Sequence, residues 1–201
     1  QMSHKFDFST AITQDTDIFA GFVSYQEDTR TFAIVGSGTS PVLMESNWGA
    51  VIGDAQTMVK EDNPDANVYT ITLDLESGDE FQFAINSSWN DQRGSGYLSA
   101  FSKDGEEYFK NSGSLGDAST KRANIECLIS GNYTFTLTTY PGEDTYEEDA
   151  ADYSEDNKEA FNINAYDTID WTYNGESEST GEEKQTNYYI KGAKITNWED
   201  V

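Results

Sequence analysis

Short stretches in which apolar and polar residues alternate recur along the sequence, and they constrain the fold more than any other feature. They span residues 31–35, 68–75, 80–85, 124–129, 132–140, 161–166 and 187–192, and each is bounded by Gly, Asn, Asp or Ser. Alternation with a period of two residues places side chains on opposite faces of a strand. Helical periodicity is nowhere sustained, so we expect an all-β chain built as an antiparallel sandwich.

Two glycine-containing turns link these expected strands. Gly78 lies in ESGDE and Gly131 lies in ISGNY. Glycine adopts positive φ angles that other residues resist. We therefore predict hairpin-like turns with positive φ at both positions.

The charge of the chain disfavours some classes of binding partner. Lys and Arg number 12 against 37 Asp and Glu, which gives a formal net charge of -25. This charge repels a phosphate backbone and an anionic lipid surface. No apolar run reaches the roughly 20 residues of a membrane span. We expect neither nucleic acid binding nor membrane insertion.

The chain divides into three parts. We expect residues 1–29 to be an extension of extra strands or linker, and residues 30–180 to be the sandwich. An Asn-Trp motif follows a strand and a glycine at residues 31–51 and again at 187–201. Residues 186–201 therefore begin a second similar module or form a closing strand.

Residues 141–160 carry a dense run of carboxylates. We expect a solvated loop there, because the carboxylates would repel one another in a compact structure. A structural calcium ion is the alternative, although the spacing of an EF-hand is missing.

Catalytic chemistry has little support in the sequence. His4 is the only histidine, and Cys127 is a lone cysteine within the strand-like NIECLI. The large number of acidic residues brings carboxylates together by chance, so it does not identify a glycosidase pair. We expect no catalytic residues, no metal ligands and no cofactor, the calcium alternative aside.

The order VGSG…NW, VYTITLDLESGDEFQFAINSSW and NIECLISGNYTFTLT, over roughly residues 30–140, resembles the SusE and SusF class of starch-binding domains. It also resembles modules of the starch adherence system proteins in the amylosomes of gut bacteria. The resemblance implies an immunoglobulin-like β-sandwich carbohydrate-binding module, with additional terminal strands, that holds α-glucan without catalysis.

The resemblance also implies where the sugar binds. Trp48 and Trp89 match the two aromatic platforms of the family. Gln82 stands where many relatives have a lysine, which shifts attention to Arg93 and Lys103 as cationic contacts.

The polar residues around Trp89 suit such a site. An indole can cover the apolar face of a pyranose ring. Asn90, Gln92 and Arg93 carry fork-shaped groups that can pair with adjacent hydroxyls, and Tyr97 follows at a position that could wall the site. The alternatives are that Trp48 plugs the end of the sandwich, that Tyr97 packs in the core and that Arg93 forms a surface ion pair.

A structural adhesin or stalk domain with an immunoglobulin-like fold is the rival to the carbohydrate-binding module, because GNYTFTLT also resembles the closing strand of bacterial surface repeats. A small β-sandwich glycoside hydrolase is a weaker third hypothesis. We expect a monomer within a larger multimodular protein, extracellular or at a bacterial cell surface.

Overall fold

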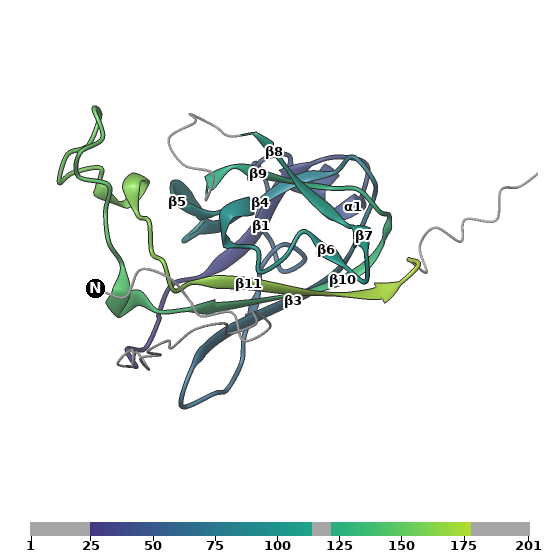
Figure 1. Cartoon of the computed structure of the whole chain (residues 1–201), viewed down its shortest axis with the longest axis horizontal. Helices are drawn as coiled ribbons and strands as arrows, with labels where there is room; N and C mark the ends of the chain where they lie inside the picture. The colour runs from purple at the N-terminus through teal and green to yellow at the C-terminus, as the bar shows by residue number, and fades with distance from the viewer. Residues whose placement is uncertain (1–24, 114–121, 178–201) are drawn as a thin grey trace, which may run out of the picture.

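The computed structural model describes residues 25–113 and 122–177, and strands make up most of the regular structure in these ranges (Figure 1). The first sheet has the order β1-β4-β9-β8, and β5 also pairs with β4; the second has the order β11-β10-β3-β2. The strands of both sheets, and the two strands of the small β6–β7 hairpin, all pair antiparallel. The all-β prediction is confirmed.

The bounds of the elements are as follows. The first sheet contains β1 (Phe32–Ser37), β4 (Glu80–Ile85), β5 (Ser88–Arg93), β8 (Phe109–Gly113) and β9 (Asn124–Cys127). The second contains β2 (Val59–Lys60), β3 (Asn67–Leu75), β10 (Gly131–Thr139) and β11 (Thr168–Gly175). The small hairpin joins β6 (Ser102–Lys103) to β7 (Glu106–Glu107), and the helical elements are α1 (Pro41–Ser46), η1 (Ser95–Tyr97), η3 (Pro141–Glu143) and η4 (Lys158–Phe161).

Aromatic side chains fill the space between the two sheets. Along β3 and β10 every second side chain is buried, which is the alternation read from the sequence. Phe81 and Phe83 in β4 meet Phe135 in β10, with ring centroids 5.4 and 5.5 Å apart. Trp171 in β11 belongs to the same core. Its indole Nε1 donates a hydrogen bond to the carbonyl of Ala100 at 2.7 Å, which satisfies its polar group.

The two glycine turns differ from the prediction. Gly78 has a positive φ of 93°, as expected, but Gly131 does not have a positive φ and begins β10. A Cβ atom on Gly131 would lie 2.2 Å from Cε2 of Tyr173. The ring of Tyr173 therefore lies too close to the backbone at this position for any residue other than glycine. Neither turn closes a hairpin, because each connects a strand of one sheet to a strand of the other.

Most of the expected strands are present, with one error. Residues 161–166 are not a strand: η4 ends at Phe161 and an irregular segment follows. Apolar and polar residues alternate here, but it is the polar side chains of Asn162 and Asn164 that are buried. Asn162 donates a hydrogen bond to Asp91 in β5, and Asn164 donates one to Asp144 in the acidic segment. The expected strand at 187–192 lies outside the described residues.

The segment before residue 30 contacts the start of β3. The amide N–H of Asp28 donates to the side chain of Asn67 at 2.8 Å, and Asn67 donates in turn to the carbonyl of Gln26 at 2.7 Å. Residues 26–28 are therefore fixed against β3. Residues 1–24 and the possible second module at 186–201 lie outside the described residues.

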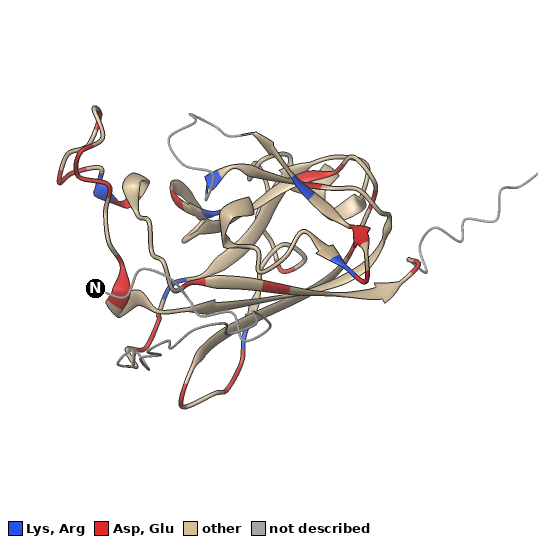
Figure 2. Cartoon of the chain, in the orientation of Figure 1, with Lys and Arg blue, Asp and Glu red and all other residues tan. Residues whose placement is uncertain are grey.

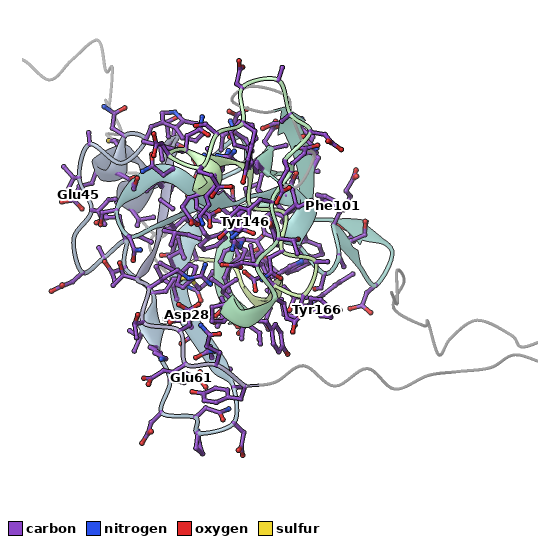
Figure 3. The ribbon with its side chains drawn as sticks, turned by 90° about the vertical axis from the view of Figure 1, so that its left-hand side faces the viewer. Asp28, Glu45, Glu61, Phe101, Tyr146 and Tyr166 are labelled. Carbon is purple, nitrogen blue, oxygen red and sulfur yellow. The ribbon has the colours of Figure 1, made fainter. Side chains whose placement is uncertain are left out.

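The acidic segment 141–160 projects from one end of the sandwich (Figure 1), and its carboxylates gather along the projection (Figure 2). Figure 3 looks onto this end of the molecule, with Tyr146 and Asp28 facing the viewer. Glu148, Asp149, Asp152, Glu155 and Asp156 are exposed. Within the described ranges, no helix has both the length and the apolar character of a membrane span.

Candidate functional site

A strained turn after α1 presents Trp48. Asn47 and Trp48 have φ angles of 41° and 56°, a left-handed conformation that residues other than glycine seldom adopt. The amide N–H of Trp48 donates to the carbonyl of Gly36 in β1 at 2.7 Å, which fixes the turn to the first sheet. Backbone strain of this kind costs stability and is concentrated at functional sites.

The β4–β5 hairpin brings Trp89 to the same place. Asn86 and Ser87 in its turn both have a φ of 53°, the pattern of a type I′ turn. The rings of Trp48 and Trp89 lie with their centroids 6.2 Å apart and their planes tilted by 45°. Trp89 is 38% exposed and Trp48 is half-buried. The structure thus brings together the two indoles that the sequence analysis selected.

The outer face of the first sheet continues from this aromatic pair. A Cβ atom on Gly49 would lie 3.7 Å from Nε1 of Trp89 and 3.6 Å from Cγ1 of Val35. Val35 pairs across the sheet with Gln82, and antiparallel partners point to the same face. Gln82 and the indole of Trp89 therefore share the face that is turned away from the core.

A polar network that the sequence analysis missed lies on this face. Gln82 and Gln92 are almost fully buried, so they are not the exposed contacts that we expected. Nε2 of Gln82 donates to the carbonyl of Arg122 at 2.8 Å, and Nε of Arg122 donates to Oε1 of Gln92 at 3.0 Å. Arg122 itself is half-buried, and burial lowers the pKa of its guanidinium. The glutamines position a partly exposed arginine that no motif marked.

Arg93 is not an exposed contact, and this expectation is wrong. Its side chain is 0% exposed and forms ion pairs with Asp91 at 2.6 Å and Asp167 at 2.8 Å. Its guanidinium also lies over the ring of Tyr97, 4.9 Å from the centroid. Tyr97 is buried, and burial raises the pKa of its phenol to about 12. Tyr97 packs in the interior, as its alternative proposed, whereas the ion pairs of Arg93 are buried and not at the surface.

Lys103 lies apart from the two indoles, whereas Asn90 is next to Trp89 in the chain and borders a cleft. Lys103 is in the β6–β7 hairpin, where its Nζ donates to the carbonyl of Trp171 and lies 4.2 Å from the centroid of that ring. It therefore packs against the second sheet. Asn90 is exposed beside Trp89, on the side that borders a cleft.

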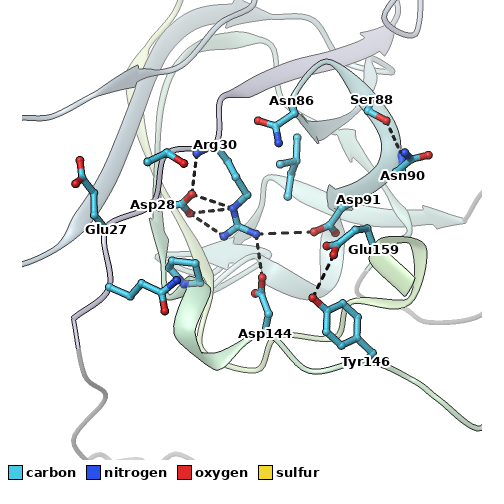
Figure 4. A pocket seen from close by; sticks show the side chains of 14 residues that line it. Glu27, Asp28, Arg30, Asn86, Ser88, Asn90, Asp91, Asp144, Tyr146 and Glu159 are labelled. Carbon is cyan, nitrogen blue, oxygen red and sulfur yellow. Dashed lines mark hydrogen bonds and ion pairs between the residues drawn. The ribbon is translucent and has the colours of Figure 1, made fainter. Parts of the chain in front are cut away.

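This cleft has a volume of about 440 Å³ and lies between the β4–β5 hairpin, residues 26–30 and the acidic segment (Figure 4). Arg30 points into its centre. Its guanidinium contacts Asp28 at 2.7 Å and Asp144 at 3.1 Å, and it lies 4.0 Å from Asp91. At the edge of the cleft, the hydroxyl of Tyr146 donates to Glu159 at 3.3 Å.

Burial and ion pairing shift the pKa values of the carboxyl groups in the cleft in opposite directions. Burial alone would raise the pKa of Asp28, but hydrogen bonds from Arg30 and Thr139 outweigh it and hold that pKa below its usual value. Burial raises the pKa of Asp91 despite its contact with Arg93. The described part of the chain contains no group of three or more His, Cys, Asp or Glu side chains placed to hold a metal ion.

Comparison with known proteins adds nothing to this description: no family model, no curated protein and no solved structure matches the chain.

Proposed function

We propose that this chain is a noncatalytic carbohydrate-binding module that holds α-glucan such as starch or maltooligosaccharides. The observation that carries the proposal is the tilted, partly exposed pair formed by Trp48 and Trp89. An indole covers the apolar C–H face of a pyranose ring and leaves the hydroxyls to side contacts. The neutral sugar also suits a chain with a net charge of -25, since it is not repelled.

The shape of the pair favours a bent chain of sugars over a flat one. The two ring planes are tilted by 45° relative to each other, so they do not form one continuous plane. Consecutive glucose rings in an α-1,4 chain turn relative to one another, whereas those of cellulose lie along a straight ribbon. Arg122, which donates a hydrogen bond to Gln92, supplies a guanidinium that donates hydrogen bonds to sugar hydroxyls beside the indoles. This is the role that the sequence analysis expected of Arg93.

The proposal includes the finer fold and the setting of the protein. An immunoglobulin-like sandwich is supported by two antiparallel sheets whose sequence-adjacent strands β3 and β4, and β9 and β10, lie in different sheets. We place the module as a monomer within a larger multimodular protein at a bacterial cell surface. Tandem copies would strengthen weak binding through a high effective concentration.

The stalk alternative would be supported by a lysine in contact with an asparagine, the pair that forms an isopeptide link. The four lysines in the described ranges contact other groups. Lys60 and Lys103 donate to backbone carbonyls, and Lys110 and Lys158 pair with glutamates. An intact mass lower than the sequence mass by one ammonia would indicate an isopeptide link and would support the stalk alternative.

The test is Trp89→Ala, measured by calorimetric titration with maltoheptaose. If the sugar covers about 80 Å² of the indole, its loss costs about 2 kcal/mol, or roughly thirtyfold in affinity. Tyr166→Ala is the matched control, because Tyr166 is also an exposed aromatic residue, 42% exposed, and is not part of the site. Unchanged affinity in Trp89→Ala, with an unchanged melting temperature, would remove Trp89 from the site.

A further inference from the structure

The tip of the β4–β5 hairpin is a narrow ridge with a different surface on each side. Ser88 and Asn90 line the cleft, while Trp89 between them turns toward Trp48. This follows from strand geometry, because successive side chains point to opposite sides. A ligand that stacks on Trp89 is therefore only the width of one strand from the cleft.

The cleft has the size of a small-ligand site and a mostly polar lining. Its volume of about 440 Å³ lies in the usual range for such sites. Tyr146 supplies an aromatic ring, Asn86 and Asn90 supply amides, and Arg30 supplies a guanidinium at the centre (Figure 4). Charged, amide and aromatic groups thus converge on one space that no part of the proposed aromatic site occupies.

Hydrogen-bond acceptors predominate on the walls. Carboxylates accept hydrogen bonds and donate none when ionised, and five of them line the cleft: Glu27, Asp28, Asp91, Asp144 and Glu159. A neutral ligand with many hydroxyl groups can donate to such acceptors, whereas a uronic acid or a sulfated sugar would be repelled. The cleft therefore disfavours an anionic sugar and accommodates an uncharged one.

The far wall is held in position before any ligand binds. Asp144 accepts hydrogen bonds from Arg30 at 3.1 Å and from Asn164 at 2.8 Å. Asn162, just after η4, donates to Asp91 in β5 at 3.1 Å. A preformed site loses less conformational entropy on binding.

We propose that this cleft is a second α-glucan subsite, reached by a chain that stacks on Trp89 and bends over the tip of the β4–β5 hairpin. The inference rests on the proposed function. The bend of an α-1,4 chain allows the turn over the ridge, and a straight β-1,4 chain cannot follow it. Glu159 and Asn90 border the opening and contact the hydroxyls of the additional glucose unit.

The test compares a short and a long oligosaccharide by calorimetric titration of the full chain. The wild type binds maltoheptaose more tightly than maltotriose, because only the longer chain fills both subsites. Glu159→Gln weakens maltoheptaose binding about tenfold, the effect of losing a hydrogen bond to a charged group, and leaves maltotriose binding unchanged. Glu155→Gln is the control, since it removes the same charge from the acidic segment outside the cleft.

Each outcome decides one point. Equal affinity of the wild type for the two oligosaccharides overturns the second subsite and leaves the indole pair intact. Equal effects of Glu159→Gln and Glu155→Gln also overturn it, because the cleft would then contribute only general charge. Failure of both oligosaccharides to bind the wild type overturns the proposed function itself.

Discussion

Two arginine side chains hold together residues that are far apart in the sequence. Arg30 pairs with Asp28 and Arg93 pairs with Asp167, and both arginines lie within 4.0 Å of Asp91 and Asp144. The network carries more negative than positive charge, yet Asp28, Asp91 and Asp167 are nearly buried. Removing one partner of a buried ion pair leaves an uncompensated charge in a poorly solvated place. The stability of the molecule therefore depends strongly on single members of this network.

Asp28→Asn gives the clearest pH-dependent prediction. The unfolded carboxyl has the ordinary pKa of 3.8 and the folded one a lower pKa, so its stabilisation is complete above pH 3.8 and is lost as pH falls through the folded value. We expect the variant to lose about 3 kcal/mol of unfolding free energy at about pH 6.5. In urea unfolding, the difference in unfolding free energy between the wild type and the variant should become smaller at about pH 3.

The control for this prediction is Asp170→Asn, because Asp170 is exposed on the outer face of the second sheet. The free energy of unfolding of Asp170→Asn should differ little from that of the wild type at about pH 6.5 and at about pH 3. A gap for Asp28→Asn that is constant from neutral to acid pH would contradict the assigned role of the Asp28 carboxylate.

Gly131→Ala tests the close approach at the start of β10. The added Cβ would lie 2.2 Å from Cε2 of Tyr173 and 2.7 Å from the carbonyl oxygen of Gly175. We expect a loss of about 2 kcal/mol in a denaturant titration. Gly78→Ala is the comparison: a Cβ there has no atom within 4 Å, so only the positive φ costs energy, about 1 kcal/mol. Equal losses would contradict the close approach.

The sequence predicted the apolar strands well because their pattern depends on local alternation. It missed β5, whose residues SWNDQR are mostly polar. Asp91 and Arg93 are buried there because they pair with each other and with charges from other segments, Arg30 and Asp167. The same long-range pairing explains the error at Arg93: nothing near it in the sequence shows that Asp167 will reach it. The resemblance selected Trp48 and Trp89 through local motifs, and the structure places the two indoles side by side.

At the scale of elements, the segment from Tyr140 to Asp167 is attached to the sandwich mainly through polar contacts. Asp167 accepts from the amide of Tyr140 at 2.8 Å and from Arg93 at 2.8 Å. Asp144 anchors the middle through Arg30 and Asn164. No residue that the structure describes between Tyr140 and Asp167 belongs to the buried hydrophobic core, so we expect this segment to open locally before the core unfolds.

Asp144→Asn should increase this local opening without unfolding the sandwich. The amide of Ile163 donates to the carbonyl of Thr145 at 2.8 Å and reports on the attachment. In hydrogen exchange followed by mass spectrometry, peptides covering residues 145–163 should exchange about tenfold faster, while peptides from β10 keep their rates. Asp149→Asn, an exposed change on the same segment, should leave both rates unchanged. Faster exchange throughout the molecule would instead indicate global destabilisation.

At the scale of the whole molecule, a net charge of -25 opposes compaction and is unevenly distributed. The carboxylates gather on the projecting acidic segment and on loops (Figure 2), whereas the proposed aromatic platform is built from neutral side chains and Arg122. Self-repulsion between exposed charges falls as salt screens them, since the Debye length shortens from about 30 Å at 0.01 M to about 8 Å at 0.15 M. Folding stability and sugar binding should therefore respond differently to salt.

Raising sodium chloride from about 20 mM to about 500 mM should increase the melting temperature by several degrees, because repulsion among exposed carboxylates is screened while the buried pairs of Arg93 are shielded from the ions. The dissociation constant of maltoheptaose should stay within about twofold over the same range, since stacking on an indole and hydrogen bonds to a neutral sugar release no counterions. Scanning calorimetry and isothermal titration on the same samples measure both quantities. Affinity that falls steeply with salt would point to a charged ligand and against an α-glucan.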